Sequence, residues 1–469
     1  MFINEKSISG NDKARMKISD LKLEWKDKNI LIVGCGASGI SCANFLSKHG
    51  FDFEIIDSRT SVANIEDIKQ QYKIVFGEFQ EKYFSDTDIL IVSPGVSIKQ
   101  PFIQAAPHQG KEVIGDVDLF CRLVDAPIIA ITGSNGKSTV TTLVGEILNA
   151  VNINTKIGGN IGVPCLDLLL EDNADCYVLE LSSFQLETTS HLSAYASVIL
   201  NLSEDHMDRY ASFSDYCKAK QKILKNSKNI IINLDDKLVA DVSKINAGKN
   251  KCITFSLSAS AKADFFIDIQ DGSEWVFHNN KPVIDISNIK IVGQHNKLNI
   301  LAALSLCSVF DIDLTKTQNI INDFSGLPHR SQVVFSNDGV QWVNDSKATN
   351  IGATSAALKG FSKNSIHLIL GGQGKGQDFR ELLPVLTSNI LQIIIYGEDA
   401  TIIVNAFKDK TAIKLMSMQT LEQSVEFISQ TANKGEVVLF SPACASFDQF
   451  DNYMHRGQAF INIVKRLCS

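Results

Sequence analysis

The clearest chemical signal in the chain is a short glycine-rich segment, Thr132-Gly-Ser-Asn-Gly-Lys-Ser138. An apolar run precedes it, and apolar residues at helical spacing follow it. In such a turn, backbone N–H groups and a helix N-terminus can face phosphate oxygens, while Lys137 reaches the terminal phosphates and Ser138 ligates Mg²⁺. The segment is a shortened form, because the usual pattern has glycine where Ile131 stands. We interpret it as a phosphate-binding loop rather than a simple turn.

Other polar or small-residue segments also follow apolar runs. Glu180 ends one such run, and the segment 201–209 packs three carboxylates, a histidine and an arginine into nine positions. Three further loops occur at 344–350, 371–375 and 441–450. Each alone would be an ordinary turn or a solvated carboxylate. Because ligands bind at the carboxyl ends of strands in open α/β sheets, the set together predicts a ligand crevice.

A second glycine-rich turn, Gly34-Cys-Gly-Ala-Ser-Gly39, follows an apolar run, and Asp57 lies about twenty residues later. This fits the dinucleotide fingerprint of a Rossmann fold. The pattern by itself leaves three interpretations open: a nicotinamide or flavin site, a site for another nucleotide, or only a tight turn.

The elements that must position these residues alternate between short β-branched runs and helical patterns, which predicts an α/β protein with parallel sheets. We expect four segments: an N-terminal extension over 1–28, a Rossmann-like domain over 29–115, a central domain over 116–326 and a C-terminal domain over 327–469. Within the central segment, residues 234–290 look polar and irregular.

Composition narrows the function classes. The 469 residues are 44% hydrophobic and carry a net charge of −7, so there is no basic excess of the kind that nucleic-acid binding requires. The ten cysteines form no C-x-x-C pair, which predicts reduced thiols without a zinc site or disulfide framework. Neither a membrane-length apolar run nor a signal-peptide layout is present. We therefore expect a cytoplasmic enzyme without nucleic-acid or membrane partners.

Taken together, these motifs resemble the Mur ligase family, the ATP-dependent amino-acid ligases of peptidoglycan precursor synthesis. The resemblance rests on the phosphate loop and, in the same order, on Glu180, His206, 293–299, Arg330 and 345–347. It extends from about residue 29 to the C-terminus. The amino-acid sequences of four segments are similar to those of the D-glutamate-adding branch of the family: 179–189, 204–210, 344–352 and 441–450.

The resemblance implies three domains: an N-terminal Rossmann-like domain, a central P-loop ATPase with a mainly parallel sheet, and a C-terminal Rossmann-like domain. The substrates implied are UDP-N-acetylmuramoyl-L-alanine, D-glutamate and ATP. ATP would phosphorylate the alanyl carboxylate, and the D-glutamate amine would attack the acyl phosphate, releasing ADP and phosphate. The first domain would hold the UDP part, so its glycine-rich turn would not bind NAD. The implied contacts there are Ala37, Ser38, Asp57, Ser58, Arg59 and Ser93.

The resemblance also implies the catalytic residues, which are Lys137, Glu180, His206, Lys220 and Arg330. The implied ATP contacts are Gly133, Ser134, Asn135, Gly136, Lys137, Ser138, Thr139 and Arg330, with Asn296 and Asn299 near adenine and Asp345 near ribose. Two Mg²⁺ ions are expected, one on Ser138 and Glu180 and one on His206 and a carbamylated Lys220. The sequence by itself does not distinguish Lys220 from Lys218 and Lys222, all of which fit a solvated helix face.

On the substrate side, the resemblance places Asn160 and His206 at the activated end of the UDP substrate. It places D-glutamate against Thr349, Lys375, Ser446, Phe447 and Tyr453. Tyr453 stands where many members carry Phe, and its hydroxyl needs a partner if it is buried. We expect a monomer.

Three competing interpretations remain at this point. A nicotinamide oxidoreductase would explain the turn at 34–39 but not the phosphate loop. A folylpolyglutamate-type ligase shares that loop, but it is disfavoured by the amino-acid sequences at 204–210 and 441–450. A catalytically silent nucleotide-binding regulator is disfavoured because every expected catalytic position is occupied.

Overall fold

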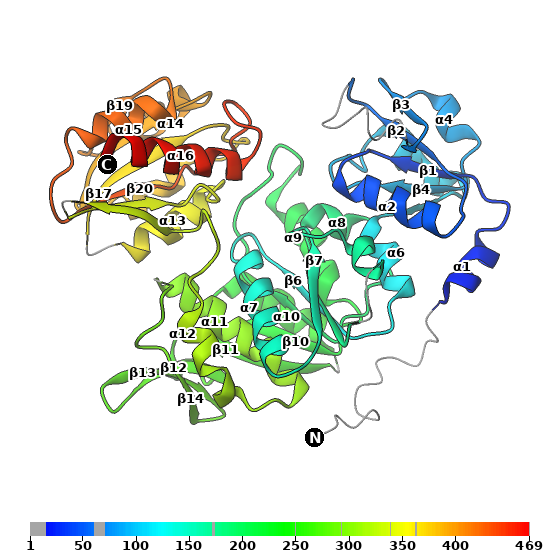
Figure 1. Ribbon diagram of the computed structural model, residues 1–469, viewed down its shortest axis with the longest axis horizontal. Helices are drawn as coiled ribbons and strands as arrows, with labels where there is room; N and C mark the ends of the chain where they lie inside the picture. Colours follow the sequence, from blue (N-terminus) through cyan, green and yellow to red (C-terminus); the bar gives the residue numbers. More distant parts are fainter. Residues whose placement is uncertain are drawn as a thin grey trace.

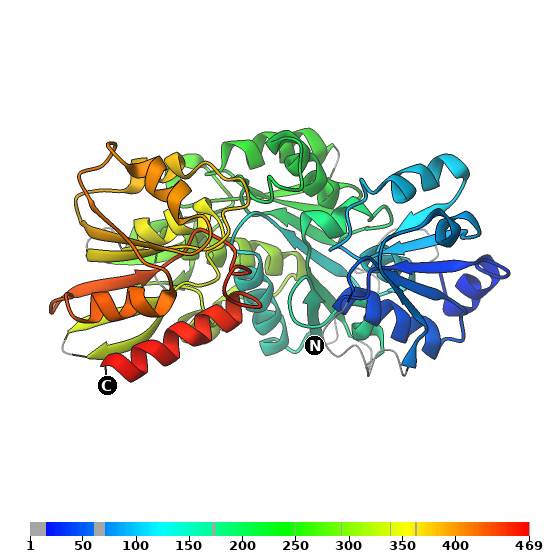
Figure 2. The same ribbon diagram turned by 90° about the horizontal axis from the view of Figure 1, so that it is seen from above.

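The computed structural model describes residues 16–60, 71–170, 174–248, 250–291, 293–337, 339–361 and 364–468. Three sheets follow one another along the chain. The first part (blue) and the last part (orange and red) lie on either side of the central part in both ribbon views (Figure 1, Figure 2). Parallel strands dominate all three sheets, so the predicted three-part α/β fold class is confirmed.

The first sheet has five parallel strands in the order β3-β2-β1-β4-β5. Its inner strands are apolar at every position or nearly so, as expected for strands covered on both faces. The strands are β1 Ile30–Val33, β2 Glu54–Asp57, β3 Ile74–Phe76, β4 Ile89–Val92 and β5 Glu112–Ile114. The helices are α1 Ile18–Glu24, α2 Ala37–Lys48, α4 Glu81–Ser85, α5 Pro101–Ala105 and the 3₁₀ turn η1 Ala106–Gln109.

The central sheet has nine strands in the order β14-β13-β12-β11-β10-β9-β6-β8-β7. Only β12, β13 and β14 pair antiparallel, as a meander at one edge. The strands are β6 Ile128–Thr132, β7 Thr155–Gly159, β8 Cys176–Glu180, β9 Ala196–Ile199, β10 Asn229–Asn233, β11 Lys251–Ser256, β12 Phe265–Gln270, β13 Ser273–His278 and β14 Lys281–Asp285. The expectation of an irregular stretch over 234–290 is wrong, because α10 and four strands occupy it.

The helices around this sheet include α7, which follows the phosphate loop, and α11, which packs against α7. Their bounds are α6 Asp116–Leu123, α7 Lys137–Ala150, α8 Ser183–Glu187, α9 Phe213–Gln221, α10 Lys237–Ala247, α11 Gln294–Cys307 and α12 Gln318–Asp323. The 3₁₀ turns are η2 Cys165–Leu169, η3 Lys222–Leu224, η4 Ala259–Ala261, η5 Ser308–Phe310 and η6 Leu314–Thr317.

The third sheet has six strands in the order β15-β16-β20-β17-β18-β19, and β15 alone runs antiparallel to its neighbour. The strands are β15 Gln332–Asn337, β16 Val340–Asn344, β17 Ser365–Gly371, β18 Ile390–Tyr396, β19 Lys414–Ser417 and β20 Glu436–Phe440. The helices are α13 Ile351–Gly360, η7 Phe379–Val385, α14 Ala400–Phe407, α15 Leu421–Ser429 and α16 Tyr453–Cys468.

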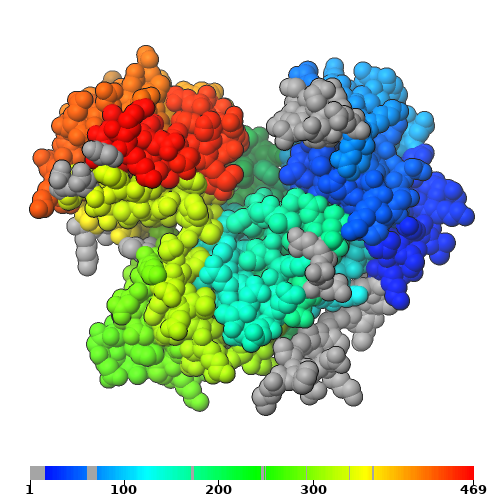
Figure 3. Space-filling view, in the orientation of Figure 1, coloured from blue at the N-terminus to red at the C-terminus, as the bar shows by residue number. Residues whose placement is uncertain are grey.

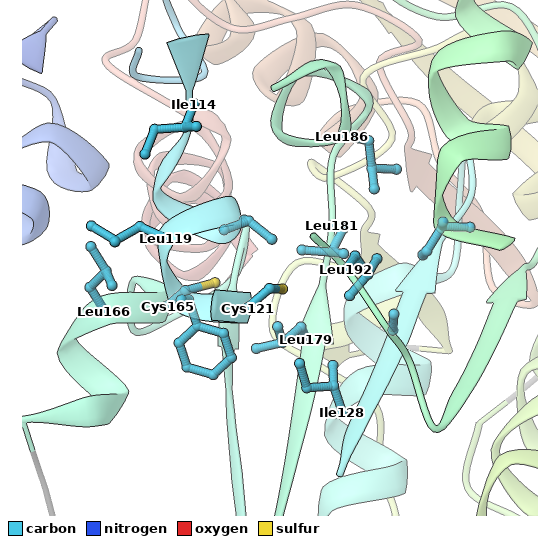
Figure 4. Packing of buried hydrophobic residues seen from close by; sticks show 14 of the residues in the cluster. Ile114, Leu119, Cys121, Ile128, Cys165, Leu166, Leu179, Leu181, Leu186 and Leu192 are labelled. Atoms are coloured by element: carbon cyan, nitrogen blue, oxygen red, sulfur yellow. The ribbon is translucent and has the colours of Figure 1, made fainter. Parts of the chain in front are cut away.

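One hydrophobic cluster joins the first and central parts across α6 and η2. Figure 4 shows Leu119 and Cys121 of α6 beside Cys165 and Leu166 of η2. The apolar side chains buried in this cluster are expected to hold the two sheets together, since each Å² of apolar surface removed from water contributes roughly 25 cal/mol. All ten cysteines are free thiols. Across the described helices, none is long and apolar enough to cross a bilayer.

Helix α1 belongs to the same cluster. Leu21 is fully buried, Trp25 is nearly so, and the Met16 N–H donates to the Arg122 carbonyl at 3.2 Å. The described end of the expected N-terminal extension is therefore packed onto the fold.

A pair of leucines tests this packing. Leu21 is 0% exposed and Leu23, two residues on in the same helix, is 76% exposed. We expect Leu21→Ala to lower the free energy of unfolding by about 2–5 kcal/mol, the usual range for a buried leucine. Leu23→Ala should change it by no more than about 0.5 kcal/mol. Denaturant titration of both variants measures this, and equal effects would show that α1 is not packed as described.

Candidate active site

A cavity of about 940 Å³ lies between the central and C-terminal parts. Its walls come from the loops after β6, β8 and β9, from α11, and from C-terminal loops. The space-filling view shows a hollow between the first and last parts of the chain, with the central part at its base (Figure 3). Among the described residues, none before Ser134 lines the cavity.

The phosphate loop turns between β6 and α7. Gly133 and Gly136 have φ of +154° and +84°, and a Cβ on Gly136 would lie 2.5 Å from Asn299 Oδ1, so glycine is required there. Lys137 Nζ folds back over the loop and donates to the carbonyls of Gly133 at 2.9 Å and Ser134 at 3.0 Å. The loop thus carries an ammonium where terminal phosphates would sit.

Glu180 and Ser138 form a candidate cation site beside this loop. Glu180 Oε1 accepts from Asn160 Nδ2 at 2.7 Å, and Oε2 is buried with no hydrogen-bond partner in the described part of the chain. Burial would raise the pKa of Glu180, but the Lys137 charge and the Asn160 contact hold it below its ordinary value. A charged carboxylate with an open oxygen fits a divalent cation. Arg330 Nη2 donates to Ser138 Oγ at 2.6 Å.

No group of three His, Cys, Asp or Glu side chains able to hold a metal occurs among the described residues. A cation at Glu180 would therefore need ligands of other kinds. Hydroxyl and phosphate oxygens are suitable, since Mg²⁺ is usually held by one or two carboxylates together with substrate phosphates and water.

Lys220 is the buried member of the three lysines around α9. It is 2% exposed, whereas Lys218 is 69% exposed at its side chain and Lys222 also faces solvent. Lys220 Nζ donates to the Gly133 carbonyl at 2.8 Å and to Thr132 Oγ1 at 3.3 Å. Burial, followed by the Lys137 charge, lowers the pKa of Lys220 well below its usual value. The buried Lys220 amine therefore faces the phosphate loop in surroundings that disfavour its charged form.

His206 also lines the cavity, in a left-handed backbone conformation with φ of +59°. Its ring packs against Phe184 with centroids 4.7 Å apart. Burial lowers the pKa of His206 to about 4, although the neighbouring Asp205 opposes this. The ring is then neutral at pH 7, as a metal ligand must be.

The residues expected around adenosine also line the cavity. Asn299 Nδ2 donates to Asn296 Oδ1 at 3.2 Å at the start of α11. Asp345 accepts from the Ser331 N–H at 2.9 Å and from Ser441 Oγ at 2.8 Å, so both of its oxygens are engaged within the protein. Burial raises the pKa of Asp345 to about 6. Asp345 thus anchors the turn that carries Arg330.

All residues expected at the amino-acid pocket line the same cavity, namely Thr349, Lys375, Ser446, Phe447 and Tyr453. Lys375 Nζ lies 2.6 Å from Asp205 Oδ1 of the central part. The Tyr453 ring lies under Lys347 Nζ at 3.9 Å. Phe447 is 68% exposed, so it borders the pocket without closing it.

The residues expected to hold UDP gather elsewhere, at the carboxyl ends of the strands in the first sheet. Asp57 accepts from the Cys35 N–H at 2.8 Å and from the Arg59 side chain, and Ser93 Oγ donates to the Gly34 carbonyl at 2.7 Å. A Cβ on Gly39 would lie 1.9 Å from the Gly34 oxygen, which explains this glycine. Three of the expected contacts are exposed: Ala37, Ser58 and Arg59.

Four residues in or beside the cavity were not among the expected contacts. They are Asp205, Lys347 and Asn350, which line the cavity, and Arg209, which lies on the loop after β9. Arg209 fastens the loop after β9 to the first part, because its guanidinium donates to the carbonyls of Pro94 and Val96 at 3.2 and 2.9 Å. The dense charges at 201–209 and the small-residue loop at 344–350 indicated a site at both segments. The contacts that these residues make between different parts of the chain could not be predicted from either segment alone.

Lys347 provides a pH test of the cavity. Burial, then the Arg330 charge, lowers the pKa of Lys347 from 10.5 to about 7. The folded protein thus binds fewer protons than the unfolded chain between those values, so the destabilisation by Lys347 is full below pH 7 and fades toward pH 10.5. We expect Lys347→Met to be more stable than wild type at pH 6.5–7, with the difference shrinking as pH rises. Melting curves over this range measure it, and a constant difference would refute the buried charge.

Known families match nearly the whole described fold. Residues 28–115 match the Mur ligase MurD-like N-terminal domain, 131–307 the Mur ligase middle domain, and 329–444 the Mur ligase glutamate ligase domain. Proteins named UDP-N-acetylmuramoylalanine--D-glutamate ligase from Shigella dysenteriae serotype 1 (strain Sd197) and Escherichia coli (strain K12) are each 40% identical over 446 residues, covering 95% of this chain and 99% of theirs.

Among solved structures, the MurF ligase from Thermotoga maritima in complex with ADP superposes with a TM-score of 0.60 at 15% identity, covering 99% of this chain and 97% of that one. The UDP-N-acetylmuramate-alanine ligase MurC from Thermotoga maritima gives 0.59 at 19% identity, covering 94% and 99%. At these identities the two structures establish the shared fold. The domain matches and the 40% identity establish more: this chain belongs to the Mur ligase family.

Proposed function

We propose that this protein is the ATP-dependent ligase that joins D-glutamate to UDP-N-acetylmuramoyl-L-alanine in peptidoglycan precursor synthesis. The observation that carries the proposal is one cavity that holds a phosphate loop, an open buried carboxylate and, facing them, a lysine-bearing pocket on the C-terminal part. The relatives named for this reaction are 40% identical over almost the full chain. We also propose that the protein acts as a monomer in the cytoplasm.

The reaction that fits this cavity is acyl activation. The alanyl carboxylate attacks the γ-phosphorus of ATP, the bond to ADP breaks, and an acyl phosphate forms. The D-glutamate amine then attacks the acyl carbon, phosphate leaves, and the amine loses a proton. The first step brings two anions together, so it needs preorganised positive charge. Lys137, folded over the phosphate loop, and Arg330, which donates to the Ser138 hydroxyl, supply that charge.

The donor set also fits Mg²⁺. Ser138 and Glu180 would hold one ion beside the phosphate loop, and His206 with a carbamylated Lys220 would hold a second. Bound there, Mg²⁺ would neutralise developing charge on phosphate oxygens. The open Glu180 oxygen and the neutral His206 ring are the features that support this assignment.

Carbamylation of Lys220 is the first prediction from this function. A neutral amine plus CO₂ gives a carbamate and a proton, and Lys220 is buried with its pKa lowered while Lys218 is exposed. We expect a ¹³CO₂-derived carbamate signal in the NMR spectrum of wild type and of Lys218→Ala, but not of Lys220→Ala. Bicarbonate depletion should lower activity, and a short carboxylic acid should partly restore Lys220→Ala. An active wild-type enzyme without the signal would contradict the assignment.

Lys375 tests the amino-acid pocket. The D-glutamate amine must stay free to attack, so its carboxylates must be bound, and Lys375 offers an ammonium within the cavity. A hydrogen bond to a charged group contributes about 1.5–3 kcal/mol. Lys375→Ala should therefore raise the KM for D-glutamate by about one to two orders of magnitude, with much less effect on the KM for ATP.

Lys410→Ala is the matched control, because Lys410 is an exposed lysine of the same C-terminal part. It should leave both KM values unchanged. An unchanged KM for D-glutamate in Lys375→Ala, or an equal rise for ATP, would show that Lys375 does not bind the amino acid.

The experiment that tests the function as a whole is phosphate release with ATP, UDP-N-acetylmuramoyl-L-alanine and a panel of D- and L-amino acids. D-Glutamate alone should support turnover at a high rate. Lys137→Ala should abolish turnover while the far-UV circular dichroism spectrum stays unchanged, because Lys137 reaches the terminal phosphates. Turnover with another amino acid, or wild-type turnover in folded Lys137→Ala, would overturn the proposal.

A further inference from the structure

A polar network crosses from the phosphate loop to the amino-acid pocket. Asn350 is the N-cap of α13, and its Oδ1 accepts from the Ala353 N–H at 2.8 Å. The same side chain faces the Asn135 side chain of the phosphate loop, with amide N···O distances of 3.3 and 3.4 Å. Its Nδ2 also donates to Asp205 Oδ2 at 3.0 Å. Asn350 therefore contacts the nucleotide loop and Asp205 at once.

Asp205 continues the network to the pocket. Its Oδ1 lies 2.6 Å from Lys375 Nζ and also accepts from the His206 N–H at 3.0 Å. Both ion-paired side chains are largely buried, so solvent screens their attraction little. An ammonium has three N–H donors, and Asp205 needs only one of them. Lys375 can therefore keep Asp205 as a fixed partner while its other donors meet a substrate carboxylate.

The nucleotide end of the network is firmly held. The Asn135 N–H donates to Asn201 Oδ1 at 2.8 Å, and Asn201 Nδ2 donates back to the Asn135 carbonyl at 3.0 Å. The backbone of Asn135 is thus fixed to the end of β9, and its side chain is the part that faces the C-terminal domain.

We propose that Asp205 and Asn350 are positioning residues that couple nucleotide binding at the phosphate loop to the placement of the Lys375 ammonium in the amino-acid pocket. The proposal rests on the proposed function for the identity of the two ligands. Coupling between two binding sites is reciprocal, so the amino acid would also tighten the nucleotide. A nucleotide-bound loop would hold Asn350, which holds Asp205, which holds Lys375 in place before D-glutamate arrives.

The test measures Lys375 itself. Wild type is treated with acetic anhydride, with and without Mg²⁺ and an ATP analogue whose β–γ bond cannot be cleaved, and modification of each lysine is followed by mass spectrometry. We expect the nucleotide to slow Lys375 modification about fivefold or more, the lower end of ordinary coupling. In Asn350→Ser, serine still caps α13 but the amide donor is gone, so most of this protection should disappear.

Thr420→Ala is the control, because Thr420 caps α15 in the same part of the chain and contributes nothing to the cavity wall. It should keep the full nucleotide effect on Lys375. Asp205→Asn is a second variant that keeps the side-chain shape and removes the charge. It should give rapid Lys375 modification whether or not nucleotide is bound.

The outcomes separate the two proposals. Lys137, which lies at the phosphate loop, reports nucleotide binding in the same spectra. If Lys137 is not protected in wild type, the nucleotide does not bind and both proposals fail. If Lys137 is protected but Lys375 behaves alike in wild type and Asn350→Ser, only the coupling fails. Loss of protection in Thr420→Ala as well would show general loosening and would also overturn the coupling.

Discussion

The structure depends on holding several cationic side chains together in one cavity of a chain whose net charge is −7. Lys137, Lys220, Arg330, Lys347 and Lys375 all line it. Like charges in one cavity repel each other, and burying a charged side chain adds a desolvation cost. The protein offsets this with two buried carboxylates and with backbone carbonyls of the phosphate loop, and by lowering the pKa of three of the lysines. The outcome is a site whose positive charge suits a polyanion, with the buried amine of Lys220 beside it.

This constraint explains how the phosphate loop and the three parts of the chain are arranged around the cavity. The Gly133 carbonyl accepts from both Lys137 and Lys220, which requires the tight loop that two positive-φ glycines allow. The C-terminal sheet must lie close enough for Arg330 to reach Ser138 and for Lys375 to reach Asp205. The first sheet is held by the core at α6 and by Arg209, so the edge expected to bind UDP keeps a fixed relation to the loop that carries His206.

Much of the fold and many of the residues that line the cavity could be predicted from the sequence. The phosphate loop and the strand-end clusters have local signatures, because turn geometry and strand periodicity are properties of short segments. The role of Lys220 could not be separated from that of Lys218, because helical spacing alone does not say which lysine is buried. The meander over 265–285 was missed because its strands mix polar and apolar residues without a regular alternation, as in β14 Lys281–Asp285. The pairing of Asp205 with Asn350 and Lys375 was not predicted, because these partners are 145 or more positions away along the chain.

The cavity serves to transfer a phosphoryl group to a carboxylate. Oxygen transfer tests it most directly. UDP-N-acetylmuramoyl-L-alanine with both alanyl carboxylate oxygens replaced by ¹⁸O is incubated with enzyme, ATP and D-glutamate, and the released phosphate is analysed by mass spectrometry. If an acyl phosphate forms and breaks at its carbon–oxygen bond, each phosphate released carries one ¹⁸O. Phosphate free of ¹⁸O, with peptide product formed, would contradict the account.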